Sequence, residues 1–359
     1  TTTAGSLTIT GTSTSAINYR IKSAGAPITI TNSINVPGYI LLDNTYGPSG
    51  STATSGYLSP NTITTSNTTS SNGITINGAL TAGSLTTPSV TYAGIVISGA
   101  STTGQAVYDA SSTLTSSNGI SITGYGLTAA TIVTLNGAMV LNTAGDLSVI
   151  ANNAAGGGNI GITSSGAITD NVNGGNITFK SNNSITQTGS IAFAANTGST
   201  EANIKYDTTW GNKSSTINIG LSTSSIGSIS FTNGSTKGTN LQALAAGAYI
   251  SIVNAINVPG YILLDNTYGG CSSCTTANTG NATQGYINLA NSSTLATGSD
   301  GIVIKIPVST GKVIAQNVSN VSAGVTINSI IHQTDNTSGT YNAITIKNPI
   351  IAVKGDINI

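Results

Sequence analysis

Short segments in which polar and apolar residues alternate recur along most of the chain. Each begins with glycine, asparagine or aspartate, and after one further residue its positions read apolar, polar, apolar. The pattern occurs at 5–9, 72–76, 118–122, 145–149, 158–162, 175–179, 189–193, 227–231 and 300–304. Because successive side chains of a strand point to opposite faces, the pattern predicts short strands that start at turns and bury one face.

One segment occurs twice, and the differences between its copies follow the same period. Residues 24–47 recur at 246–269, with changes at Pro27/Tyr249, Thr29/Ser251, Thr31/Val253 and Ser33/Ala255, which is every second position. The positions between them keep isoleucine, at Ile28, Ile30 and Ile34 and at Ile250, Ile252 and Ile256. This predicts a strand with one packed and one free face, in duplicated modules at about 24–83 and 246–305.

The spacing of the predicted strands selects the fold class. Between 145 and 189 the strand starts are 13 to 17 residues apart, too close for helical crossovers, so parallel strands must be joined by short corners. We therefore expect one all-β domain over 1–359, a right-handed parallel β-helix (β-solenoid) of about 20 residues per coil. Loops 48–56 and 270–285 should project from its wall.

Three further features bear on this expectation. Segments 70–81 and 116–128 are alike and 46 residues apart, an interval that suits two coils. The segment 239–247 is the one helix candidate. A Greek-key sandwich of tandem domains is the alternative fold.

The central stretch 145–198, GDLSVIANNAAGGGNIGITSSGAITDNVNGGNITFKSNNSITQTGSIAFAANTG, resembles the repeats of filamentous-haemagglutinin-like adhesins. These are large surface proteins of two-partner secretion systems, and similar repeats extend over about 137–235. The resemblance implies a right-handed parallel β-helix in a bacterial protein that is exported to the cell surface or the extracellular space.

The composition of the chain argues against nucleic acid and membrane as partners. Only 6% of residues are charged and the net charge is zero, so no basic surface for nucleic acid is expected. No apolar run reaches the roughly 18 residues that span a bilayer, which argues against membrane insertion. The opening TTTAGSLTIT lacks the features of a signal peptide, so we interpret the chain as mature or as a fragment. Three phenylalanines and one tryptophan predict a narrow aliphatic core.

Cys271 and Cys274 form a CSSC motif in the longer of the two variable loops. A single CxxC motif without a second pair or a nearby histidine is a weak metal signal. In an exported chain we expect a local disulfide, while an intermolecular or redox-active pair and free thiols remain open. No metal or other cofactor is predicted.

Two corner motifs are candidates for ligand binding. Asp43, Asn44 and Tyr46, with Asp265, Asn266 and Tyr268 in the second copy, could present a carboxylate, an amide and an aromatic ring to a glycan. The alternative is a structural corner in which Asp and Asn satisfy backbone amides and Tyr packs on the coil.

Enzymatic and ice-binding functions have less support. The acidic residues Asp109, Asp146, Asp170, Glu201 and Asp207 are widely separated, and no catalytic cluster is expected. Thr-x-Thr motifs at 8–10, 29–31 and 62–64 suggest an ice-binding array, but the middle third of the chain lacks them.

Both ends of the sequence carry strand patterns with little to shield them. Open β-helix edges favour continuation, so we predict a structural fibre subunit that assembles head to tail with copies of itself. The expected subunit contacts are Thr8, Thr10, Ile351, Val353, Ile357 and Ile359. A segment of a large adhesin that binds glycans or cells is the alternative.

Overall fold

The structure is a computed structural model that describes part of the chain. The described ranges are residues 2–4, 7–8, 17–23, 28–30, 33–36, 39–43, 57–59, 62–65, 72–77, 79–80, 84–87, 94–101, 106–109, 111, 113–126, 131–153, 160–197, 201–211, 215–220, 228–231, 239–246, 248–253, 256–268, 284–289, 294–296, 302–306, 310–315, 325–329, 344–346 and 357–358. Loop 48–56 and nearly all of loop 270–285 lie outside these ranges.

The described residues form strands and no helix, and the strands repeat in three positions along the chain. Face 1 contains β2 (Leu7–Thr8), β5 (Ile34–Val36), β8 (Thr62–Thr65), β11 (Ser84–Thr87), β18 (Ile168–Asp170), β21 (Ile191–Phe193), β24 (Ile229–Phe231), β27 (Ile256–Val258) and β30 (Thr294–Ala296). Face 2 contains β3 (Ile17–Lys22), β6 (Tyr39–Asp43), β9 (Asn72–Asn77), β12 (Gly94–Ser101), β19 (Asn176–Ser181), β22 (Asn203–Asp207), β25 (Thr239–Leu244), β28 (Tyr261–Asp265), β31 (Ile302–Ile306), β33 (Val325–Ser329) and β35 (Ile357–Asn358). The long strands β14 (Thr113–Gly126) and β16 (Ala138–Asn153) bend through the corner and belong to both faces, which join in one 22-stranded sheet.

Face 3 holds the remaining strands. They are β1 (Thr2–Ala4), β4 (Ile28–Ile30), β7 (Tyr57–Ser59), β10 (Ala79–Leu80), β13 (Val107–Asp109), β15 (Thr131–Leu135), β17 (Ile160–Ser164), β20 (Ser184–Gln187), β23 (Ile217–Ile219), β26 (Tyr249–Ile252), β29 (Gln284–Leu289), β32 (Thr310–Ala315) and β34 (Ile344–Ile346). They form a four-stranded and a nine-stranded sheet.

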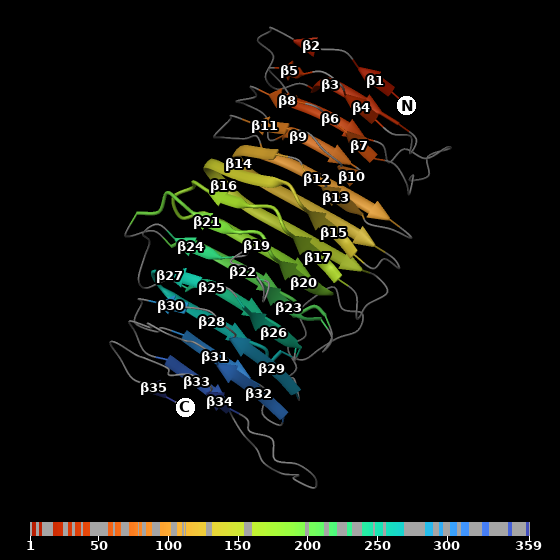
Figure 1. The fold of residues 1–359 in the computed structure, drawn as a ribbon. Coiled ribbons are helices and arrows are strands. Elements are labelled where there is room, and N and C mark those ends of the chain that lie inside the picture. Colours follow the sequence, from red (N-terminus) through yellow and green to blue (C-terminus); the bar gives the residue numbers. More distant parts are fainter. Residues whose placement is uncertain are drawn as a thin grey trace.

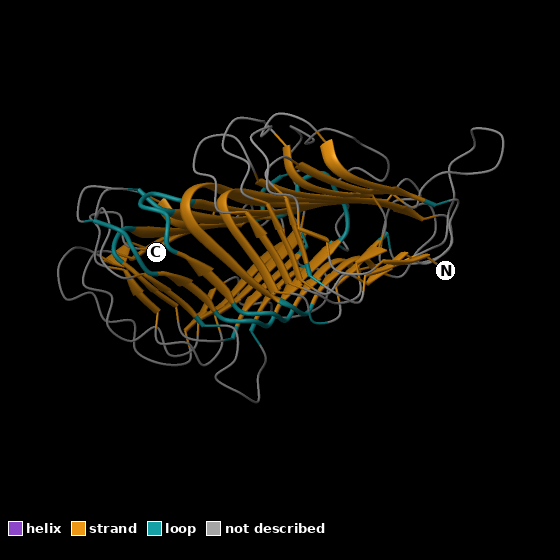
Figure 2. Ribbon diagram, turned by 90° about the horizontal axis from the view of Figure 1, so that it is seen from above, coloured by secondary structure: helices purple, strands orange, loops and turns teal. Residues whose placement is uncertain are grey.

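Strands of the same face pair in parallel from one coil to the next, as β19 pairs with β22 and β22 with β25. The coils stack in sequence order, so that β1–β3 and β33–β35 lie at opposite ends of the stack (Figure 1). The view from above shows the strands arranged in layers around the interior (Figure 2). The all-β, parallel β-helical fold predicted from the sequence is thus confirmed.

Coil length differs from the prediction of about 20 residues. Paired residues on face 2 are separated by 21 positions at Leu241 and Ile262 and by 40 at Ile262 and Ile302. Most coils are therefore longer than predicted, because the corners between the strands vary in length. The two-coil prediction is confirmed, since Ile74 pairs with Ile95 and Ile95 with Ile120, 46 residues from Ile74.

The core consists of stacked inward columns of aliphatic side chains. On face 2 one column contains Ile40, Ile74, Ile95, Ile120, Leu147, Ile177, Ile204, Leu241 and Ile262, all of them buried. Parallel pairing in register places like side chains above one another, so each branched residue packs against the next coil. Ring stacks continue this order: Phe179 lies over Tyr206 with centroids 5.4 Å apart, and Phe193 over Phe231 at 4.3 Å.

Of ten core positions predicted from the alternation, nine are buried, namely Ile28, Ile30, Ile34, Ile162, Ile177, Phe179, Ile250, Ile252 and Ile256. The tenth, Ile160, is 40% exposed, so that prediction is wrong. The reason is a register shift between Ile160 and Ile162 against β20, which breaks the period of two.

The two copies of the duplicated segment fold alike. The strands β4, β5 and β6 of the first copy correspond to β26, β27 and β28 of the second, so both copies occupy face 3 and then faces 1 and 2 of the next coil. The helix candidate at 239–247 is wrong where the structure describes it, because Thr239–Leu244 form β25 and pair with β22 and β28.

Candidate functional site

Charged residues gather in one register column at the end of face 2, next to the corner that leads to face 3. We call this the corner column; its register positions are Lys22, Asp43, Asn77, Ser98, Thr123, Ile150, Lys180, Asp207, Leu244, Asp265, Lys305 and Asn328. The column holds three of the ten basic and three of the ten acidic residues of the chain. Every aspartate in it has a lysine as a register neighbour, in the pairs Lys22 and Asp43, Lys180 and Asp207, and Asp265 and Lys305.

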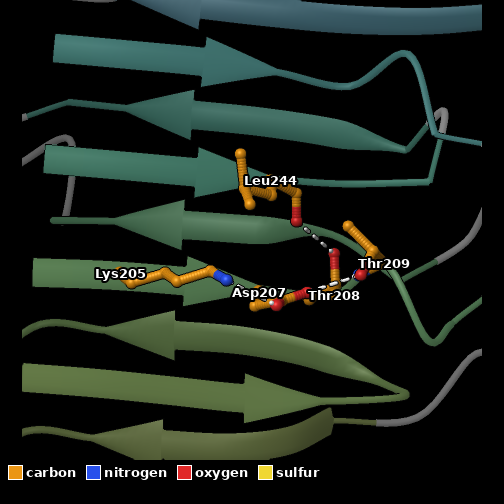
Figure 3. A network of polar contacts seen from close by, with 5 residues as sticks. All are labelled: Lys205, Asp207, Thr208, Thr209 and Leu244. Atoms are coloured by element: carbon orange, nitrogen blue, oxygen red, sulfur yellow. Dashed lines mark hydrogen bonds and ion pairs between the residues drawn. The ribbon is translucent and has the colours of Figure 1, made fainter. Parts of the chain in front are cut away.

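Asp207 organises the turn that follows β22 (Figure 3). The backbone N–H and the hydroxyl of Thr209 both donate to Asp207 Oδ1, at 3.0 and 2.7 Å. The Nζ atom of Lys205 lies 3.1 Å from Asp207 Oδ2. Thr208 donates its hydroxyl to the carbonyl of Ser215 at 3.0 Å, with a second, longer contact to the carbonyl of Leu244 at 3.5 Å. Both oxygens of the Asp207 carboxylate are thus engaged, Oδ1 by Thr209 within the turn and Oδ2 by Lys205.

Asp265 repeats this geometry after β28. The backbone N–H and hydroxyl of Thr267 donate to Asp265 Oδ1 at 3.0 and 2.6 Å, and Lys305 Nζ lies 3.6 Å from Oδ2. Asn266 is buried, and its side-chain amide donates to the carbonyl of Ala248 at 3.0 Å. Both turns therefore share the sequence Asp, any residue, Thr, aromatic, which occurs at 207–210 and 265–268 and, in sequence, at 43–46.

The aromatic residues of the two turns, Trp210 and Tyr268, are half-buried at the surface. Lys180 places its Nζ atom 3.5 Å from the centroid of the Trp210 ring, a cation–π contact. Burial lowers the pKa of Lys180, while Asp207 opposes that shift. The pKa of Tyr268 is raised by burial and then by the negative charges of Asp265 and Asp207.

The structure brings together part of the site predicted from the sequence. Asp265 and Asn266 are buried within the turn and are occupied by internal hydrogen bonds, whereas Tyr268 remains at the surface. Asp43 is buried at the equivalent place in the first copy; Asn44 and Tyr46 lie outside the described residues. Sequence reasoning missed Lys180, Asp207 and Trp210. The repeated Asp-x-Thr-aromatic pattern at 207–210 was the signal that could have found Asp207 and Trp210, but not Lys180.

Three other acidic residues that the structure describes, Asp109, Asp146 and Asp170, lie apart from the corner column. Asp109 and Asp170 are fully buried, and the carboxylate of Asp109 accepts the Gly137 backbone N–H at 3.2 Å. Asp146 lies at the surface, where its Oδ1 accepts the backbone and side-chain N–H groups of Asn176 at 3.0 and 3.1 Å. Within the described ranges no three His, Cys, Asp or Glu side chains are grouped as a metal site would need. In the same ranges no helix has the length and apolarity to cross a membrane.

Other predicted positions are placed only in part. Cys271 and Cys274 lie outside the described residues, as do Thr10, Ile351, Val353 and Ile359. Thr8 belongs to β2 and pairs with Asn35, and Ile357 belongs to β35 and pairs with Val325.

The Thr-x-Thr motifs do not share one face, since Thr8 and Thr62–Thr65 are on face 1 and Thr29 is on face 3. Along face 1 the threonine column is interrupted by residues of other types, among them Asn35, Val140 and Ala192.

Comparison of the chain with protein-family models, with curated proteins and with solved structures gave no significant match. The resemblance of 145–198 to haemagglutinin-like repeats therefore stays a prediction, and the function has to be argued from the geometry of the chain itself.

Replacing Asp207 by alanine should lower the free energy of unfolding by about 1–3 kcal/mol, because two donors of Thr209 lose their acceptor in a buried turn. Urea unfolding followed by circular dichroism measures the loss. The matched control is Asp207→Asn, which keeps an acceptor oxygen and should lose less. Equal stability of wild type and Asp207→Ala would show that the turn does not depend on this carboxylate.

Proposed function

We propose that the chain is a non-catalytic structural protein of a cell surface or extracellular matrix. It acts as a β-helical unit that continues end to end into the next unit through its open coil edges. The observation that carries the proposal is the set of edge strands at the two ends of the stack. Among the described strands, β3 and β35 of face 2 each have a single partner, β6 and β33, and β1 and β34 of face 3 pair only with β4 and β32.

An edge strand presents backbone N–H and C=O groups that can pair with another strand. Here the edges keep the register of the interior. Ile357 pairs with Val325, which continues the register of Ile262 and Ile302, and Asn358 pairs with Thr326 beside it. A further coil of the same type could therefore extend the same columns, and stacking of identical units in this way produces an open filament.

The surface of the described coils supports an extracellular structural role. Amide and hydroxyl side chains bond along the outside from coil to coil, as Asn203 does to Asn176 at 2.5 Å and Ser165 to Asn136 at 2.6 Å. Because these neutral groups are polar, such a surface can be solvated with few charged side chains. The haemagglutinin-like pattern of 145–198 points the same way, and it also supports the second candidate, a segment of a large surface adhesin.

The proposal is tested by placing a charge in an edge column. Ile357→Lys should abolish filaments of the purified chain, because it places an ammonium group at the register position that the buried Ile262 occupies within the stack. Asn358→Lys is the matched control, since it adds the same charge one residue away, at the register position of the half-buried Leu263, and it should still assemble. Negative-stain electron microscopy and light scattering measure assembly, and deletion of 341–359 should leave soluble β-rich rods.

Two results would contradict the fibre proposal. Filaments of Ile357→Lys equal to those of the wild type would remove the edge from the subunit contact. Isolated rods of the wild-type chain at all concentrations would favour the adhesin-segment alternative, in which the edges continue into the same polypeptide.

A further inference from the structure

We propose that Trp210 and Tyr268 form a binding site for a linear glycan, which lies across the coils along the axis of the β-helix. The two rings are the last residues of two turns with the same sequence pattern and the same hydrogen bonds. The inference does not depend on end-to-end assembly, because it concerns the side of the stack and not its edges.

The spacing of the two coils that carry these turns suits a polymer of pyranose units. Asp207 and Asp265 occupy the same column and are separated by one coil, that of Leu244. Two steps of a parallel sheet correspond to roughly 10 Å, and each ring follows its aspartate by three residues. In an extended β-linked glycan every second ring presents the same face at about this interval, so one chain could stack on both aromatic residues.

The side chains around the rings provide the polar part of the site. The ammonium groups of Lys205 and Lys305 come from side chains that are 35% and 45% exposed, while the aspartate side chains they neutralise are only 8% and 7% exposed. The surface thus presents aromatic rings and N–H donors, and its carboxylates are withdrawn into the turns. Aromatic rings stack on the C–H faces of sugars, and ammonium groups donate to sugar hydroxyls or, more strongly, to uronate carboxylates.

The lysine that contacts Trp210 adds a further coil to the site, that of β19. Lys180 is the register neighbour of Asp207 on the side away from Leu244, and its Nζ atom lies over the indole ring. This cation–π contact holds the ring of Trp210 against Lys180. Burial lowers the pKa of Lys180. The site therefore extends from the coil of β19, which carries Lys180, to that of β31, which carries Lys305.

Trp210 is the single tryptophan of the chain, so its fluorescence reports on this site alone. We expect a saturable change when the purified protein is titrated with β-linked hexasaccharides. The neutral arm uses cellohexaose and the acidic arm a hexauronate, and tighter binding of the latter at low salt would assign the ammonium groups to carboxylate recognition. Disaccharides should bind more weakly, because they cannot span both rings.

Tyr268→Ala separates the two-ring site from a single aromatic contact. It should weaken hexasaccharide binding roughly 3- to 10-fold, the equivalent of one lost stacking contact, and leave disaccharide binding at Trp210 unchanged. The control is Tyr125→Ala, because Tyr125 is 55% exposed on face 2 outside the two turns. Circular dichroism verifies the fold, and calorimetry of Trp210→Phe provides a measurement that does not need the indole.

The proposal is overturned if neither hexasaccharide gives a saturable signal, or if Tyr268→Ala and Tyr125→Ala have the same effect. Filament formation by the same variants is the separate measure of the structural role, so the loss of one property does not imply the loss of the other.

Discussion

Phe179→Ala should lower the free energy of unfolding by about 3–5 kcal/mol, the range measured when a buried aromatic ring is deleted from a packed core. Phe179 is fully buried, and its ring is stacked on that of Tyr206 with an interplanar angle of 10°. The neighbouring coils are held by backbone ladders and cannot collapse into the gap, so most of the cavity should persist. The measure is a lower urea midpoint with an unchanged m-value.

Thr178→Ala is the matched control for this prediction. Thr178 precedes Phe179 in β19 and is half-buried on the outer side, so its loss should change stability by less than about 0.5 kcal/mol. Tyr206→Phe adds a second comparison, because it keeps the ring stack and removes only the hydrogen bond from Tyr206 Oη to Gln187 Oε1, 3.1 Å long. Equal losses for Phe179→Ala and Thr178→Ala would contradict the columnar core.

The core columns could be predicted from the sequence because they depend on local information. The period of two decides which side chain of a strand points inward, and Ile28, Ile177 and Ile250 follow it without exception. Ile160 fails because a register shift is a property of the strand pair and not of the strand alone. Coil length fails for a related reason, since closing a longer corner costs little and the sequence does not limit it.

The candidate site was predicted in part for the same reason. The duplication of 24–47 at 246–269 identified Asp265 and Tyr268, but Asp207 and Trp210 lie outside both copies. Their common place appears only when parallel pairing brings β22 and β28 into one column. The sequence left open whether the Asp265 carboxylate faces a ligand or satisfies backbone amides; in the structure it accepts the Thr267 N–H, as Asp207 accepts the Thr209 N–H. That use is what positions the two rings.

Asp170 is a buried charge in the core, and its position could not have been inferred from separate acidic residues along the sequence. It pairs in register with Leu141 and Phe193 in an inward column of face 1 and is fully buried. Its Oδ1 accepts the Val172 backbone N–H at 2.8 Å, and its Oδ2 is buried without a hydrogen-bond partner. The pKa of this carboxyl is raised from 3.8 to about 6. Burial is the largest cause; the hydrogen bond from Val172 lowers the pKa, and the charge of Asp146 raises it.

A folded-state pKa above the unfolded value means that the native state binds the proton more tightly. The resulting stability is fully present below about pH 4 and is lost as the pH rises through about 6. A shift of about two units corresponds to roughly 3 kcal/mol. Asp170→Asn should therefore leave stability near pH 4 almost unchanged and raise it at pH 8 by up to about 3 kcal/mol, because the amide keeps the acceptor for Val172 and carries no charge.

Urea midpoints of wild type and Asp170→Asn, measured from pH 4 to pH 8, test this expectation. The wild-type midpoint should fall across pH 4–6 relative to that of the variant, and the difference should level off above pH 7. Glu201→Gln is the control, since Glu201 is exposed and its neutralisation should leave the pH profile unchanged. A variant that is less stable than the wild type at pH 8 would mean that the Asp170 carboxylate is stabilised in the core by a partner, and that its burial costs the fold nothing at neutral pH.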